Sequence, residues 1–245
     1  MISKWSGWAG WMVAAALACP AASGSGAADD LTAFRPPAPG TVFTYETKSR
    51  TYMGVLYGRH AYGTYANRFK VTVLRDHSPY RGIAVFRLSR QTKYKQRGKP
   101  ARVSTQISVR RLADGNEIAS LTPSGTFAME FAPHDGYLAW PLSVGKTWSV
   151  KVVRKAVPKG APSTLEAHYR VEAIEDLRTR AGTFKTVRIA WRKVKSKGPF
   201  KETVGKTWYV PSLGVAALIT TGREGVRLGL HETTSQTELV SVKLP

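Results

Sequence analysis

The sequence predicts an all-β domain with mainly antiparallel strands. Short runs rich in β-branched and aromatic residues alternate with Gly, Pro and Asn/Asp turns from about residue 41 almost to the C-terminus. Several runs alternate strictly in polarity, as residues 187–192 do, with Val187, Ile189 and Trp191 on one face and charged or small residues on the other. After the N-terminal leader, no clear helical stripe of ten or more residues occurs. Segment 166–177 comes closest and stays ambiguous between helix and strand.

Residues 1–28 are typical of a cleaved signal peptide. Lys4 gives the positive start, residues 7–18 form an apolar stretch too short to span a bilayer stably, and Ala16 and Ala18 give the small-residue spacing of a cleavage site. We therefore expect an exported protein, located in the periplasm or at the outer membrane.

Cys19 is the only cysteine of the 245 residues and lies within the leader. Its context, Ala-Leu-Ala-Cys, is similar to a bacterial lipobox, although Ala16 stands where Leu is usual and Pro20 follows directly. Two alternatives remain open: Cys19 is lipidated and tethers the protein to a membrane, or it is removed and the protein is soluble. In either case the rest of the chain has no disulfide, thiol nucleophile or cysteine zinc site.

After the leader, residues 29–40 are rich in proline, glycine and small residues, which predicts a linker. Residues 41–245 are expected to form a single β domain, in which two sub-halves could meet near 135–145. The predicted strands are 42–47, 67–74, 83–94, 103–111, 126–131, 147–153, 164–174, 183–195, 202–210, 215–221 and 226–238.

In segments 40–45, 145–150 and 205–210, a glycine precedes a predicted strand and an aromatic residue follows three residues later. Each glycine is predicted to form a turn that opens into a strand, with the aromatic side chain on the core face. The uneven spacing excludes a solenoid or propeller repeat.

The charge is strongly positive, with 37 Lys+Arg against 16 Asp+Glu and a formal net charge of +21. Two acid-free stretches, 77–113 and 177–201, are predicted to be hairpins that carry cations toward their tips. They are either anion-binding surfaces or solvated faces that protect edge strands. The candidate anion-binding residues are Arg87, Arg90, Lys93, Lys95, Arg188, Arg192, Lys193 and Lys195. Expected partners are anionic lipid, lipopolysaccharide or acidic polysaccharide, and export argues against nucleic acid.

Motifs for catalysis, cofactors and metals are incomplete. Two Gly-Lys-Thr triplets lack the first glycine of a phosphate-binding loop, Ser143-x-x-Lys146 lacks its partner motifs, and the five histidines are scattered. The sequence therefore predicts no catalytic residue, cofactor or metal ligand. The alternative is a hydrolase of envelope polymers, for which Glu130, His134 and Asp135 are the candidates.

Three strings in the C-terminal half carry a family resemblance: Gly-Lys-Thr-Trp at 145–148, Ala-Gly-Thr-Phe-Lys-Thr-Val-Arg-Ile at 181–189 and Thr-Trp-Tyr-Val-Pro-Ser-Leu-Gly-Val at 207–215. Over residues 140–240 the chain resembles a family of exported bacterial proteins of unknown function described as TapB-like. The resemblance implies a curved antiparallel sheet that wraps on itself and is partly barrel-like. It also implies a location in the periplasm or on a membrane, and because the family has no established catalytic residues, none carry over to this chain. From the missing motifs we expect a non-catalytic binding or structural module of the cell envelope.

Overall fold

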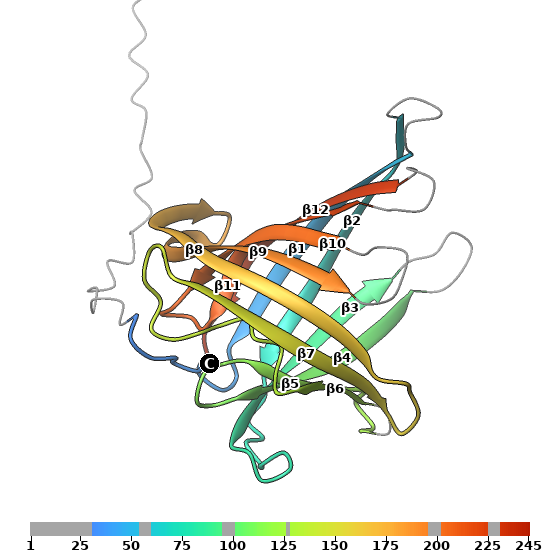
Figure 1. The fold of residues 1–245 in the computed structure, drawn as a ribbon. Coiled ribbons are helices and arrows are strands. Elements are labelled where there is room, and N and C mark those ends of the chain that lie inside the picture. Colours follow the sequence, from blue (N-terminus) through green and yellow to red (C-terminus); the bar gives the residue numbers. More distant parts are fainter. Residues whose placement is uncertain (1–30, 54–59, 95–100, 126–127, 196–201, 225–230) are drawn as a thin grey trace, which may run out of the picture.

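The computed structural model describes residues 31–53, 60–94, 101–125, 128–195, 202–224 and 231–245. They form twelve strands in one closed antiparallel barrel, in which each strand pairs with its neighbours in sequence and β1 also pairs with β12 (Figure 1). The strands are β1 (Val42–Met53), β2 (His60–Val73), β3 (Val85–Tyr94), β4 (Arg102–Arg111), β5 (Glu117–Leu121), β6 (Ala128–Ala132), β7 (Thr147–Val157), β8 (Ser163–Thr179), β9 (Gly182–Lys195), β10 (Glu202–Val210), β11 (Val215–Glu224) and β12 (His231–Lys243).

The all-β, antiparallel prediction is confirmed, and the sheet closes completely. Every predicted strand is present, with ends that differ by up to seven residues, and the ambiguous segment 166–177 lies within β8. Strand β5 was not predicted. The predicted signal peptide, Cys19 and Lys95 lie outside the described residues.

The main core lies inside the barrel. Phe43, Val171, Val187, Ile189 and Leu239 each have 0% exposure there. A smaller second core lies on the outer face of the sheet, where Val85, Val109, Ile118 and Ala119 pack together with the half-buried Tyr80. Tyr80 belongs to the β2–β3 connection, which therefore shields part of the outer face from solvent.

Residues 31–40 and the β6–β7 connection cover one end of the barrel. Phe34 is 8% exposed and stacks on Phe86, with 5.6 Å between ring centroids, while the Leu142 amide donates to the Leu31 carbonyl at 2.8 Å. Asn116 fastens the β6–β7 connection by donating to the Leu138 carbonyl and accepting from its amide, both at 2.8 Å. Residues 31–40 therefore pack on the barrel, which differs from the linker expected there.

Two of the three glycine–aromatic segments match the prediction. Gly40 and Gly145, with φ of +88° and +86°, precede β1 and β7, and the aromatic residue that follows each packs in the core. Gly205 differs because it lies within β10, opposite Trp191 of β9. The following aromatic residue, Trp208, faces outward and donates to Glu175 at 2.7 Å.

Candidate functional site

A cavity of about 430 Å³ lies inside the barrel. Side chains from β2, β3 and β11 give it an apolar side: Phe69, Val71, Leu88, Val215 and Ile219. Side chains from β4, β5, β10 and the β6–β7 connection give it a polar side: Gln106, Ser108, Arg110, Glu117, Asp135, Tyr137 and Tyr209. Its size falls within the range of small-molecule sites, and its lining suits a ligand with both apolar and polar parts.

Arg110 is the central charge of the polar side. Its Nε donates to Ser108 Oγ at 3.2 Å and its Nη1 to the Gly115 carbonyl at 3.1 Å. Its Nη2 lies 3.5 Å from the carboxylate of Glu117, the register partner on β5. The Arg110 side chain retains 23% exposure because it borders the cavity. The guanidinium is therefore held in place by the protein and also presented to the cavity.

Asp135 holds the backbone of Glu117 and Tyr137 in place through hydrogen bonds. Its Oδ1 accepts from the Glu117 amide at 2.9 Å and from the Tyr137 amide at 3.3 Å, and its own amide donates to the Glu117 carbonyl at 2.8 Å. Burial raises the pKa of Glu117 to about 7, although Arg110 opposes the shift. Burial by itself lowers the pKa of Arg110, but the charges of Glu117 and Asp135 raise it overall. Arg110 thus stays cationic while Glu117 is only partly ionised near neutral pH.

Tyr209 brings a hydroxyl to the same cavity. Its side chain is 1% exposed, and its hydroxyl has no hydrogen-bond partner among the residues that the structure describes. Burial raises the pKa of Tyr209 and of Tyr137, so both phenols are neutral and able to donate. Most buried polar groups are hydrogen-bonded, so an unpartnered hydroxyl beside a cavity points to a ligand or water as its partner.

Two cations predicted as surface residues face the inside of the barrel. Arg90 lines the cavity with its guanidinium carbon 3.9 Å from the ring centroid of Phe69. The Lys193 Nζ lies 5.1 Å from the ring centroid of Trp191 and 6.0 Å from that of Tyr169, and burial lowers the pKa of Lys193. The barrel interior therefore holds two further cations, Arg90 and Lys193, besides Arg110.

Three other predicted anion-binding residues face outward and pair with carboxylates. Arg87 lies 3.2 Å from Asp76, Arg188 contacts Glu172 and Glu175 at 3.0 and 2.9 Å, and Arg192 contacts Glu202 at 2.7 Å. Lys93 is exposed on the outer face, and Lys195 is the last residue of β9.

The two basic hairpins, β3–β4 and β9–β10, do not adjoin one another. Four strands separate them in either direction around the barrel. The candidate residues also face both sides of the sheet, because alternation sends Arg90 and Lys193 inward and their neighbours outward. A single anion-binding surface formed by all the candidate residues is therefore not present in the described residues.

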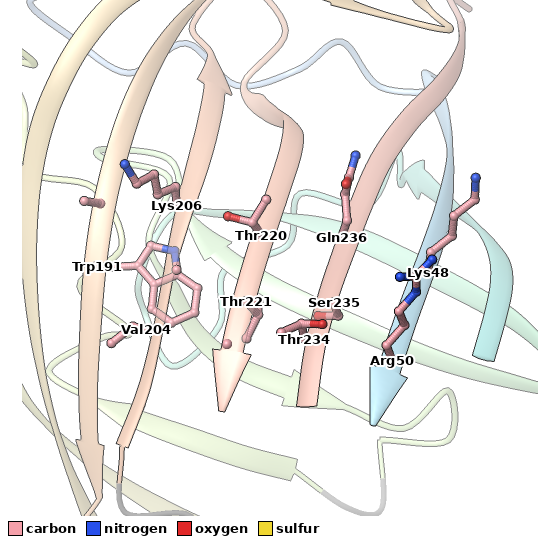
Figure 2. Close-up of a pocket in the computed structure, with 13 residues that line it drawn as sticks. Lys48, Arg50, Trp191, Val204, Lys206, Thr220, Thr221, Thr234, Ser235 and Gln236 are labelled. Atoms are coloured by element: carbon pink, nitrogen blue, oxygen red, sulfur yellow. The ribbon is translucent and has the colours of Figure 1, made fainter. Parts of the chain in front are cut away.

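A second concavity, the outer groove, lies on the outside of β9, β10, β11, β12 and β1 and has a volume of about 760 Å³ (Figure 2). Its charged lining residues, Lys48, Arg50 and Lys206, are all cationic. Between them lie Thr220, Thr234 and Gln236. The groove and the cavity are on opposite faces of the same strands.

The three hydrolase candidates do not converge. Glu130 accepts from the Tyr80 hydroxyl at 3.0 Å and contacts Arg81 at 2.6 Å on the outer face, whereas Asp135 lines the inner cavity. His134 Nδ1 accepts from the Gly136 amide at 3.0 Å and so belongs to a turn. Within the described ranges, no group of three or more His, Cys, Asp or Glu could hold a metal ion. No helix there is long and apolar enough to cross a membrane.

No family model matches the chain, and no curated protein matches it. Two solved structures are similar. A proposed exported protein with a YmcC-like fold from Bacteroides fragilis is 14% identical, with 87% of this chain and 100% of that chain covered and a TM-score of 0.44. A proposed lipoprotein from Parabacteroides distasonis is 13% identical, with 86% and 99% covered and a TM-score of 0.43. Function is therefore inferred from the residues of this chain.

Proposed function

We propose that this protein is an exported, non-catalytic cell-envelope protein that binds a small amphiphilic acid inside its barrel. The observation that carries the proposal is the 430 Å³ cavity, which is apolar on one side and presents Arg110 on the other. The leader at 1–28 and the resemblance of residues 140–240 to TapB-like proteins support the envelope location.

The chemistry of the cavity favours an acid group on the ligand. An arginine fork can hold a carboxylate through charge-assisted hydrogen bonds, and Arg110 stays charged while its partner Glu117 has a pKa of about 7. A buried charge that is incompletely neutralised is costly, so an anionic ligand group would relieve that cost. The neutral Tyr209 hydroxyl adds a donor, and Phe69 and Leu88 can contact an apolar chain.

Dodecanoate, with dodecanol as the uncharged analogue, tests the proposal. Calorimetry with the full mature protein should show that dodecanoate binds, and that Arg110→Gln weakens it by about 10- to 100-fold, because a hydrogen bond to a charged group contributes about 1.5–3 kcal/mol. Arg178→Gln, at an exposed site, is the matched control and should change the affinity less than twofold. If neither compound binds, or if Arg110→Gln has no more effect than Arg178→Gln, the proposal is wrong.

We further propose that attachment to the envelope depends on Cys19. Mass spectrometry of the mature N-terminus distinguishes the two alternatives. A diacylglyceryl-modified Cys19 at the N-terminus indicates a tethered protein, and an N-terminus beyond residue 19 indicates a soluble periplasmic or secreted one.

A further inference from the structure

The outer groove is a different site from the cavity, on the opposite face of the sheet. Lys206 of β10 and Lys48 and Arg50 of β1 stand at its two sides, with Thr220 of β11 and Gln236 of β12 between them (Figure 2). The alternation along each strand places these side chains outward, because Thr207, Ile219, Thr237 and Thr47 next to them in sequence face the barrel interior.

The charges of the outer groove all have the same sign. The side chains of Lys48 and Lys206 are 74% and 47% exposed. Lys206 contacts Glu172 at 2.9 Å, while Lys48 lies 3.8 Å from Glu46, and neither glutamate lines the groove. Arg50 is exposed, and the residues that line the groove include no carboxylate to neutralise it. The groove therefore attracts anions from solution at low salt.

The width of the groove restricts the length of the ligand. Three inter-strand spacings separate β10 from β1, with β11 and β12 between. At about 4.8 Å per spacing, the two cationic sides are about 14 Å apart. A free phosphate or a single sugar acid cannot reach both sides, whereas an extended chain with repeated acidic groups can.

The floor of the groove suits a ligand that carries hydroxyl groups between its charges. Thr220 and Thr234 present hydroxyls, and Gln236 presents an amide with both donors and an acceptor. Gly222, on the same outer face, has no side chain and lets a ligand approach the backbone. Trp191 and Val204 also line the groove, and a sugar ring has both hydroxyl groups and apolar C–H faces that match such a mixed lining.

We propose that the outer groove binds an extended acidic glycan, a chain of sugar acids that lies across β10, β11, β12 and β1. Carboxylates of the chain contact Lys206 at one side and Lys48 and Arg50 at the other, and sugar hydroxyls contact the threonine and glutamine side chains of the floor. This proposal does not depend on the ligand of the inner cavity.

Polygalacturonate, its monomer galacturonate and the uncharged glucan dextran are the probes. At low ionic strength the mature protein should bind polygalacturonate and neither of the others. The triple variant Lys48→Gln, Arg50→Gln, Lys206→Gln should lower the affinity about tenfold, at about 0.5 kcal/mol for each exposed contact. The control triple, Lys151→Gln, Lys155→Gln, Arg170→Gln, removes the same charge from exposed sites on β7 and β8 and should lower it less than threefold.

Equal loss in the two triple variants would mean attraction by net charge alone and would overturn the proposal. If galacturonate binds as tightly as the polymer, the proposal that the ligand extends across the groove is wrong. A different contrary result is that the protein fails to bind polygalacturonate, binds phosphatidylglycerol vesicles, and loses the vesicles only in the groove triple variant. That result would overturn the glycan proposal and assign the groove to a membrane surface. Gln236→Glu adds a negative charge to the floor and removes no cation, so it should also weaken polygalacturonate binding. An unchanged thermal midpoint shows that each variant is folded.

Discussion

At the scale of single residues, the unpartnered hydroxyl of Tyr209 should affect both stability and ligand binding. A buried hydroxyl without a partner costs about 1–3 kcal/mol, so Tyr209→Phe should leave the free energy of unfolding unchanged or raise it by about 1 kcal/mol. The same change should weaken dodecanoate binding severalfold. Urea denaturation and calorimetry measure the two effects. Tyr45→Phe is the control, because the Tyr45 hydroxyl donates to the Ala216 carbonyl at 2.9 Å and its loss should destabilise the barrel.

Glu117 should make stability depend on pH in an unusual direction. Its pKa is about 7 in the folded protein against an ordinary 4.5, so between these values the folded protein holds a proton that the unfolded chain has released. The free energy of unfolding should therefore fall by about 3 kcal/mol from this group as pH rises from about 4.5 to 7, and stay constant above. Glu117→Gln removes this loss.

Denaturation of Glu117→Gln and the native protein side by side isolates the group. The two should be equally stable below pH 4.5, and the variant should become progressively more stable toward pH 7. Parallel profiles would contradict the pKa shift. Dodecanoate should also bind more tightly to the native protein at pH 6 than at pH 8, because a protonated Glu117 no longer competes for Arg110.

The orientation of single charged residues was only partly predictable. Lys193 continues the inward series Val187, Ile189 and Trp191, so its direction could have been inferred from the alternation. Arg110 could not, because its neighbour Val109 is apolar and suggests the opposite orientation. Val109 is buried on the outer face by the β2–β3 connection, a tertiary contact that no local pattern reveals.

At the scale of elements, Gly205 shows how tightly β10 is packed. A Cβ at this position would lie 2.1 Å from the Thr220 carbonyl oxygen and 2.4 Å from the Trp191 ring, and backbone cannot give way cheaply. Gly205→Ala should cost about 3 kcal/mol and lower the thermal midpoint by about 10 °C. Gly222→Ala on β11 is the control, because its Cβ would be 3.7 Å from its nearest neighbour. Similar midpoints for the two variants would refute the packing argument.

Strand β5 was not predicted because its sequence, Glu-Ile-Ala-Ser-Leu, has neither clear alternation nor β-branched enrichment. A β-bulge in its pairing with β4 also interrupts the two-residue period, so Glu117 faces the cavity while Ala119, two residues later, faces the outer core. The Gly205 segment was misinterpreted for a related reason. A glycine opposite a tryptophan resembles a turn glycine in sequence, and only the pairing of β9 with β10 distinguishes them.

At the scale of the whole molecule, the covered end of the barrel should be energetically important. Phe34 contacts Phe86 and Trp140 at 5.6 and 6.2 Å between centroids, so Phe34→Ala should cost about 3–5 kcal/mol. Differential scanning calorimetry of the mature protein measures the loss. Pro36→Ala, at an exposed position in the same segment, should have little effect. A negligible effect of Phe34→Ala would mean that residues 31–40 contribute nothing to the core.

Closure of the barrel also has a kinetic consequence. Val42 of β1 pairs with Lys243 of β12, so the sheet cannot close until β12 has been added. Such distant contacts are the slowest to form, and until they do, β1 and β11 are open edges to which another chain can add. A chain that crosses a membrane from its N-terminus delivers β1 first and β12 last. For the export that we propose, this topology would delay completion of the barrel until translocation has ended, and the incomplete barrel would need protection from aggregation during that interval.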